Sequence, residues 1–184
     1  SEWIWSMPRR TWERTAHLGD VTVRSFDEAD RREVVELWHE TGLYRPWNDP
    51  DRDIDRKRAH SPEGLLVADS DGAVVGSAMV GYDGHRGWIN YLAVSPHHRG
   101  RGVAARLVSE AEVWLALQGC PKINLQVRPD NHEAAELYRH LGYEPFDTAD
   151  LGRRLIFESD PDGGSGVGTA AWGGDAVRCA GERG

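Results

Sequence analysis

A short glycine-containing segment between a predicted strand and a predicted helix is the feature that most constrains the fold. Residues 94–106 read Val-Ser-Pro-His-His-Arg-Gly-Arg-Gly-Val-Ala-Ala-Arg. Residues 88–94 before it have strand character, and residues 102–118 place apolar side chains three and four apart, as in an amphipathic helix. Gly100 and Gly102 let the backbone approach a ligand closely and adopt positive φ. A strand that continues through such a loop into a helix predicts a mixed α/β domain.

The chemistry of this loop indicates an anion site. The first turn of the following helix offers N–H groups without intrahelical partners, and the helix dipole adds partial positive charge there. Residues 84–109 contain four arginines and no acid, a net charge of +4, so the other 158 residues carry −12 of the total of −8. The pattern predicts a cradle of the kind that holds pyrophosphate. From these residues alone, an ordinary tight turn with a solvated basic edge stays open.

Periodicity along the rest of the chain predicts an α/β (α+β) domain with a mixed, mostly antiparallel central sheet and about four helices. We expect an N-terminal extension over residues 1–20 and one domain over 21–158. The predicted strands cover 21–26, 65–68, 74–80, 88–94, 123–127 and 155–157, and the predicted helices lie at 27–42, within 48–62, and at 102–118 and 131–141. Residues 159–184 hold 8 of the 21 glycines and few large apolar residues. This tail is predicted to be disordered, because it cannot bury enough surface to offset its ordering entropy.

Composition excludes several classes of protein. An acidic balance of 30 Asp and Glu against 22 Lys and Arg argues against a general nucleic-acid or anionic-membrane binder. There is no apolar run of about 18 residues and no apolar block of a signal peptide near the start, so we expect a cytoplasmic protein without a membrane span. The two cysteines have no disulfide framework or metal-ligand spacing, and we expect no metal site.

Two known phosphate-binding patterns can be compared with the loop. A P-loop requires Lys followed by Ser or Thr after its second glycine, where this chain has Val103 and Ala104, so a nucleotide triphosphatase is disfavoured. The spacing Gly100-x-Gly102-x-x-Ala105 fits the loose dinucleotide pattern. That pattern expects an acid about 20 residues further on, whereas the chain has basic residues around the next strand. An NAD(P)-binding oxidoreductase fragment stays open as the weaker alternative.

Several motifs together resemble the GNAT acetyltransferases. Arg99-x-x-Gly102-x-Ala104 is similar to the family signature, and Tyr-Leu-Ala-Val-Ser-Pro over residues 91–96 is similar to the strand that leads into it. Downstream, the spacing from Asn131 to Tyr138 and the Leu-Gly-Tyr at 141–143 resemble a second cofactor-side block. The stretches over residues 87–94 and 122–128 particularly resemble bacterial members close to the ribosomal-protein alanine N-acetyltransferases.

This resemblance implies a reaction. Acetyl-CoA would donate the acetyl group to a primary amine in a ternary complex, without an acyl-enzyme; the amine could belong to a protein N-terminus, a lysine or a small molecule. Backbone groups of Leu92, Ala93 and Val94 would pair with the pantetheine arm as an added strand does, and one of their N–H groups would polarise the thioester carbonyl. Asn131 would contact the cofactor, unless it serves only as a helix N-cap. The pyrophosphate would lie against Arg99, Gly100, Arg101, Gly102, Val103 and Ala104.

The resemblance also assigns the leaving-group acid. Tyr138 is the candidate, because a phenol with a pKa near 10 is protonated at neutral pH and can donate to the departing CoA thiolate. Its alternative role is core packing beside Leu137 and Leu141. The base is less clear, since Gln126 stands where the ribosomal-protein relatives have Glu, and glutamine accepts no proton at neutral pH.

Gln126 could still orient a water or the substrate amine. Possible relays for the proton are His85, Glu63 and Asp130. In this family the segment after the first helix often lines the acceptor site, which makes Tyr44, Trp47 and Asp49 candidate substrate residues. The absence of a carboxylate at position 126 also leaves open a non-catalytic CoA-binding or regulatory module, and a homodimer is compatible with the sequence.

Overall fold

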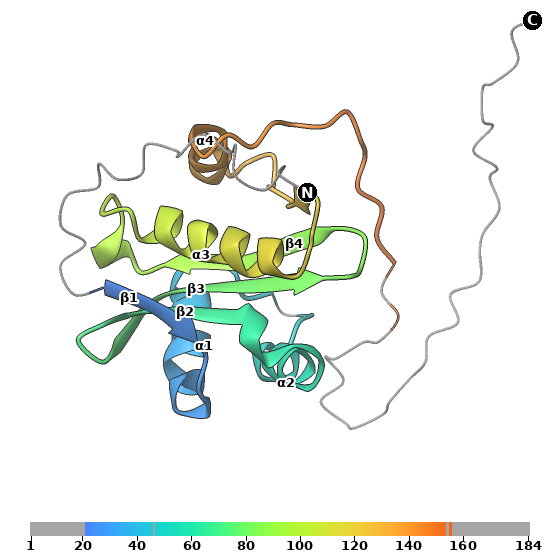
Figure 1. Cartoon of the computed structure of the whole chain (residues 1–184). Coiled ribbons are helices and arrows are strands. Elements are labelled where there is room, and N and C mark those ends of the chain that lie inside the picture. The colour runs from blue at the N-terminus through green and yellow to red at the C-terminus, as the bar shows by residue number, and fades with distance from the viewer. Residues whose placement is uncertain (1–20, 46, 154, 156–184) are drawn as a thin grey trace, which may run out of the picture.

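A five-stranded sheet separates two pairs of helices in the computed structural model, which describes residues 21–45, 47–153 and 155. Helices α3 and α4 lie on one face of the sheet, with α1 and α2 on the other (Figure 1). In chain order the elements are β1 Val21–Ser25, α1 Arg31–Glu40, α2 Pro50–His60, β2 Leu65–Ser70, β3 Ala73–Tyr82, β4 Gly87–Val94, α3 Val103–Leu117, β5 Ile123–Asn124 and α4 His132–His140.

The strands follow one another across the sheet in the order β1-β2-β3-β4-β5. The first three pairs are antiparallel and the pair β4 with β5 is parallel, so the predicted mixed, mostly antiparallel sheet is confirmed. Asp71 and Gly72 connect β2 to β3 with φ values of 54° and 84°. A tight hairpin turn with two positive φ values favours Asp-Gly, which is why this connection is readable from the sequence.

Hydrophobic residues form one core on each face of the sheet. On β2 the side chains alternate: Leu65 and Val67 join the core under α1 and α2, whereas Leu66 and Ala68 join the core under α3. Both cores contain large side chains that are fully buried: Trp38 on α1, Ile54 on α2, and Leu107 and Leu115 on α3. The sheet is therefore covered on both faces, as the two helix pairs require.

One predicted strand is wrong in length, and another falls mostly outside the described residues. The strand predicted over residues 123–127 is wrong in length, because β5 ends at Asn124 and residues 125–128 are irregular. Only two of its residues pair with β4. The strand predicted over 155–157 falls mostly outside the described residues, and Leu155 itself lies in a bend. The extension over 1–20 and the tail over 159–184 lie outside the described residues, so these domain limits stay predictions.

Within the part of the chain that the structure describes, no helix is long and apolar enough to cross a membrane. The same residues contain no group of three or more His, Cys, Asp or Glu side chains that could hold a metal ion.

Candidate active site

The loop between β4 and α3 is the segment for which the sequence predicts an anion cradle. A 3-10 turn over Pro96–His98 is followed by Gly100 and Gly102, whose φ values are 70° and 83°. Gly102 is the N-cap of α3, and the first helical hydrogen bond runs from the Arg106 N–H to the Gly102 carbonyl at 3.0 Å. The N–H groups of residues 103–105 therefore lack intrahelical partners, and no acid lies in the first turn. These donors and the helix dipole favour an anion at this end of α3.

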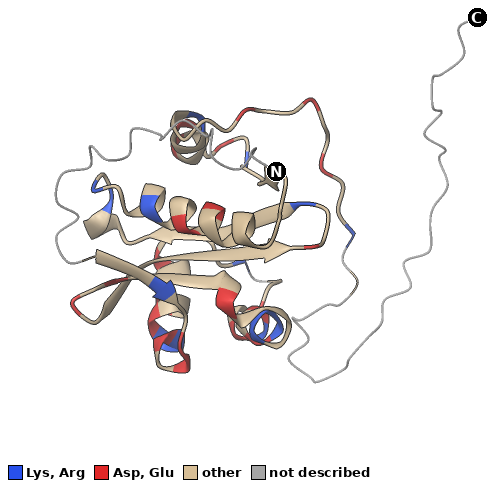
Figure 2. Ribbon diagram, viewed as in Figure 1, with Lys and Arg blue, Asp and Glu red and all other residues tan. Residues whose placement is uncertain are grey.

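Arg99 and Arg101 lie in this loop and Arg106 lies near the start of α3, where Figure 2 shows Lys and Arg positions in blue on the ribbon. The Arg99 guanidinium reaches back to the Val94 carbonyl at 3.4 Å and across to the Glu133 carboxylate on α4 at 3.5 Å. Arg106 pairs with Glu110 one turn further along α3 at 2.8 Å. Arg99 thus ties the loop to both β4 and α4, and its exposed guanidinium adds positive charge next to the free helix end.

The edge of β4 next to the cradle opens toward β5. The parallel ladder between these strands pairs Gly87 with Ile123 and Trp88 with Asn124, six residues before β4 ends at Val94. Within the described residues, the rest of this edge has no ladder partner in β5. An extended ligand arm can add to such an edge as a strand does.

A β-bulge lies in this open part of β4. The β3–β4 register runs from Ser77 opposite Ala93 to Met79 opposite Asn90, so two residues of β4 face one residue of β3. The first of the two, Tyr91, has a φ of 50°. A positive φ is strained for an aromatic residue, and such strain is of order 1–3 kcal/mol.

Four side chains from different elements meet at the bulge, and sequence reasoning missed this group. The Tyr91 ring stacks on Trp38 with a centroid separation of 4.1 Å, and its hydroxyl donates to the Asp53 carboxylate at 2.5 Å. The Trp38 indole N–H donates to the Ser77 hydroxyl at 2.9 Å, and that hydroxyl donates to the Tyr91 carbonyl at 3.2 Å. The sequence marks Tyr91 only as a strand residue, because the contacts join positions 14 to 53 residues apart.

Tyr138, the candidate acid, lies on α4 and is buried with 8% of its surface exposed. Its ring packs edge-on against the Tyr143 ring, with a centroid separation of 5.5 Å, and belongs to the core under α3. Burial raises the pKa of Tyr138 to about 12. The core-packing role is therefore present in the structure, and the phenol is fully protonated at neutral pH.

The other cofactor-side candidates occupy different settings. Asn131 is the N-cap of α4, and its side chain accepts from the Ala134 N–H at 3.1 Å. Gln126 is exposed in the irregular segment after β5 rather than in a strand. Among the proposed relays, Asp130 is exposed and 3.7 Å from Arg128, and His85 lies exposed in the turn between β3 and β4. The positions of Gln126, Asp130 and His85 do not identify any of them as the general base.

The acceptor candidates lie in the segment between α1 and α2. Tyr44 stacks on His39 with a centroid separation of 4.3 Å, and Trp47 is 47% exposed. Asp49 caps α2 by accepting from the N–H groups of Asp51 at 3.0 Å and Arg52 at 3.3 Å. Asp49 thus has a structural role, whereas the two aromatic side chains present surface to solvent.

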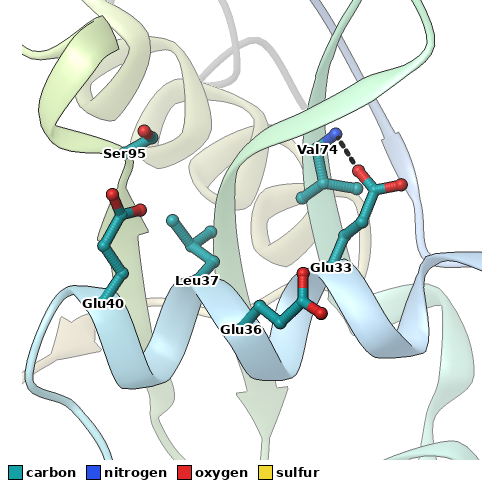
Figure 3. Close-up of a pocket in the computed structure, with 6 residues that line it drawn as sticks. All are labelled: Glu33, Glu36, Leu37, Glu40, Val74 and Ser95. Atoms are coloured by element: carbon teal, nitrogen blue, oxygen red, sulfur yellow. Dashed lines mark hydrogen bonds between the residues drawn. The ribbon is translucent and has the colours of Figure 1, made fainter.

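A separate acidic pocket of about 330 Å³ lies between α1 and the ends of β3 and β4. Figure 3 shows its lining residues: Glu33, Glu36, Leu37, Glu40, Val74 and Ser95. The Glu33 carboxylate accepts from the Val74 N–H at 2.8 Å. Three carboxylates repel phosphate, so this pocket is a poor site for an anion.

The model of the acetyltransferase (GNAT) family matches residues 32–143. The chain belongs to this family. An acetyltransferase of Yersinia enterocolitica is 51% identical over 140 residues, which cover 76% of this chain and 99% of that protein. The enzyme is thus an acyltransferase of the GNAT class, and the resemblance found in the motifs is confirmed at the level of the family.

Solved structures agree on the fold. A transcriptional regulator from Bacillus halodurans gives a TM-score of 0.61 at 22% identity, over 73% of this chain and 99% of that one. An aminoglycoside N-acetyltransferase in complex with CoA gives a TM-score of 0.60 at 20% identity, over 73% and 94% of the two chains. At such identities the likeness concerns the fold alone, and the predicted GNAT-like fold is confirmed.

Proposed function

We propose that this GNAT protein moves an acetyl group from acetyl-CoA to a primary amine by direct attack in a ternary complex. The observation that carries this proposal is the continuity of two binding elements. The open edge of β4 ends at Val94, and the loop over residues 95–102 joins it to the free helix end at Val103, so an extended thioester arm and its pyrophosphate would meet adjoining binding groups. Neither element supplies a covalent carrier for the acetyl group.

The residues of the cradle suit the cofactor by their chemistry. Backbone donors at residues 103–105 and the guanidinium of Arg99 would hold the doubly charged pyrophosphate. Leu92, Ala93 and Val94 would pair with the amides of the pantetheine arm along the open edge. When bound, acetyl-CoA supplies an activated carbonyl carbon and a thiolate leaving group.

Carbonyl activation comes from the bulge. Leu92 follows Tyr91 directly, and its N–H would donate to the thioester oxygen as negative charge develops there. Attack by the amine nitrogen forms the new C–N bond, and the tetrahedral species then collapses by breaking the C–S bond. The amine loses one proton, and the departing sulfur carries the electron pair.

Tyr138 would stabilise that sulfur. Its pKa of about 12 lies above the value of about 8.5 for a thiol, so complete proton transfer to the thiolate is unfavourable. The phenol therefore acts as a hydrogen-bond donor to the developing thiolate. Because Gln126 cannot take the amine proton, that proton passes to water, with Gln126 orienting the amine or the water.

A binding experiment with a matched control tests the cofactor site. We would measure thermal stabilisation by acetyl-CoA in the full chain, Gly102→Ala and Gly72→Ala. Gly102 and Gly72 have φ values of 83° and 84°, so alanine introduces similar backbone strain at both positions. We expect Gly102→Ala to weaken acetyl-CoA binding at least tenfold and Gly72→Ala to leave it unchanged.

The same samples decide between functions. Absence of stabilisation of the wild-type chain by saturating acetyl-CoA refutes the proposal. Stabilisation without acetyl transfer to any member of a panel of protein N-termini, lysines and small amines favours the CoA-binding module. Displacement of acetyl-CoA by NADPH would favour the dinucleotide alternative.

A further inference from the structure

Tyr91 holds a backbone conformation that its own residue type disfavours. With a φ of 50°, it occupies the left-handed region, where a side chain crowds the following carbonyl. An isolated strand would return this residue to the extended conformation. The surrounding structure must therefore fix it in place, and such residues often lie where a site needs a particular backbone direction.

Contacts on three elements fix Tyr91. Trp38 of α1 and Ser77 of β3 are both fully buried, and they contact the Tyr91 ring and its carbonyl oxygen, respectively. The indole N–H of Trp38 donates to the hydroxyl of Ser77, so these two contacts support each other. On α2, one oxygen of the Asp53 carboxylate accepts a hydrogen bond from the Tyr91 hydroxyl, and the other oxygen accepts one from the Arg56 guanidinium at 3.0 Å.

The bulge sets the direction of the next peptide group. Tyr91 and Leu92 together face the single residue Ala78, so the ladder between Ser77 and Met79 is interrupted at this point. An inserted residue rotates the following backbone groups relative to a regular ladder. The N–H that the proposed function assigns to the thioester oxygen, that of Leu92, is the group that directly follows the strained residue.

We propose that Asp53 and Tyr91 are positioning residues for the acetyl transfer. With Trp38 and Ser77, they hold the bulge of β4 and so aim the Leu92 N–H at the thioester carbonyl. This inference rests on the proposed function. It also connects the first turn of α2, which begins directly after the acceptor candidates Trp47 and Asp49, to the strand that activates the acetyl donor.

Kinetics and amide spectra test the proposal in the full chain. Tyr91→Phe removes the hydroxyl and keeps the ring, Asp53→Asn removes the charge, and Asp53→Glu keeps the carboxylate. One matched control is Tyr82→Phe, which removes the hydroxyl that donates to the Gly84 carbonyl. The other is Asp55→Asn, which removes a carboxylate on α2, the helix of Asp53, that pairs with Arg31 of α1. Each variant is checked for its melting temperature and for the Leu92 cross-peak in an assigned ¹H–¹⁵N spectrum.

Tyr91→Phe and Asp53→Asn should lower kcat about tenfold to a hundredfold, with KM for acetyl-CoA within about threefold, because misplacement of a reacting group acts mainly on the chemical step. Both should shift the Leu92 amide in the ligand-free protein, Asp53→Glu should recover part of kcat, and both controls should match the wild type. An unmoved Leu92 amide or an unchanged kcat overturns the proposal, as does an equal loss in the controls. If the wild type acetylates no amine, the proposed function fails, while the ligand-free spectra still test how the bulge is held.

Discussion

Replacing Tyr138 by Phe separates the two roles that the structure gives this residue. The ring packs in the core under α3, and the hydroxyl is the proposed donor to the thiolate. Phenylalanine keeps the ring contacts, including the edge-on contact with Tyr143, and removes only the hydroxyl. We therefore expect the free energy of unfolding at pH 8 to change by less than about 1 kcal/mol.

The pKa of Tyr138 gives a second, quantitative expectation. Its pKa is about 12 in the folded protein and about 10 in the unfolded chain, so the folded state keeps its proton over a range in which the unfolded state loses it. Stability from this residue is complete below pH 10 and is lost as pH rises toward 12. The total loss is about 2.7 kcal/mol, of which about 1.3 kcal/mol falls between pH 9 and pH 11.

The assay combines unfolding with turnover. Urea unfolding followed by tryptophan fluorescence at pH 8, 9 and 11 gives the free energies for the wild type, Tyr138→Phe and the control Tyr82→Phe. Tyr82 packs against the same core, and its hydroxyl bonds to a backbone carbonyl at 3.2 Å. Release of the CoA thiol in the presence of a reactive amine gives kcat for the same three proteins.

Tyr138→Phe should lose about 1.3 kcal/mol less than the wild type between pH 9 and pH 11, and its kcat should fall about a hundredfold. The binding of acetyl-CoA should change much less than kcat. An unchanged kcat removes Tyr138 from the reaction. An alkaline stability loss equal to that of the wild type refutes the argument from burial, and an equal fall of kcat in Tyr82→Phe shows that the effect is not specific.

Two further predictions concern the sheet. Alanine at Gly76 would place its Cβ 3.0 Å from both the Ala93 carbonyl oxygen and a Leu107 methyl, and 3.2 Å from Val103. Gly76→Ala should therefore lower the free energy of unfolding in urea by about 1–3 kcal/mol and weaken acetyl-CoA binding, because it displaces the start of α3. Unchanged affinity for acetyl-CoA would contradict this coupling. The Arg24 guanidinium, 2.7 Å away, lowers the pKa of the Asp30 carboxyl, so its stabilisation is complete above about pH 4 and is lost as pH falls further. Asp30→Asn should therefore show a shallower decline in unfolding free energy between pH 5 and pH 2.5 than the wild type, and equal slopes would refute that role.

The elements that the sequence predicts well are those whose signals are local. The Asp71-Gly72 hairpin follows from two residues that accept positive φ, and the cap of α4 follows from Asn131, whose side chain accepts from the Ala134 N–H in the N-cap role that the sequence left as its alternative. The length of β5 was not predictable in the same way. Its apolar residues continue to Val127, but pairing with β4 ends at Asn124, and pairing depends on where the neighbouring strand lies.

The features of the candidate site also differ in whether local sequence or tertiary contacts produce them. The sequence by itself indicated the anion site, because a strand, two glycines, a helix start and the arginines Arg99, Arg101 and Arg106 in a stretch without an acid are all local features, whereas the structure places Arg86 in the turn at the other end of β4. Only the tertiary structure decided the burial of Tyr138 and the strained conformation of Tyr91. Both properties depend on contacts between elements, such as the bond from Tyr91 to Asp53 across 38 positions. Periodicity within one segment left core packing of Tyr138 as an open alternative and gave no sign of the Tyr91 conformation.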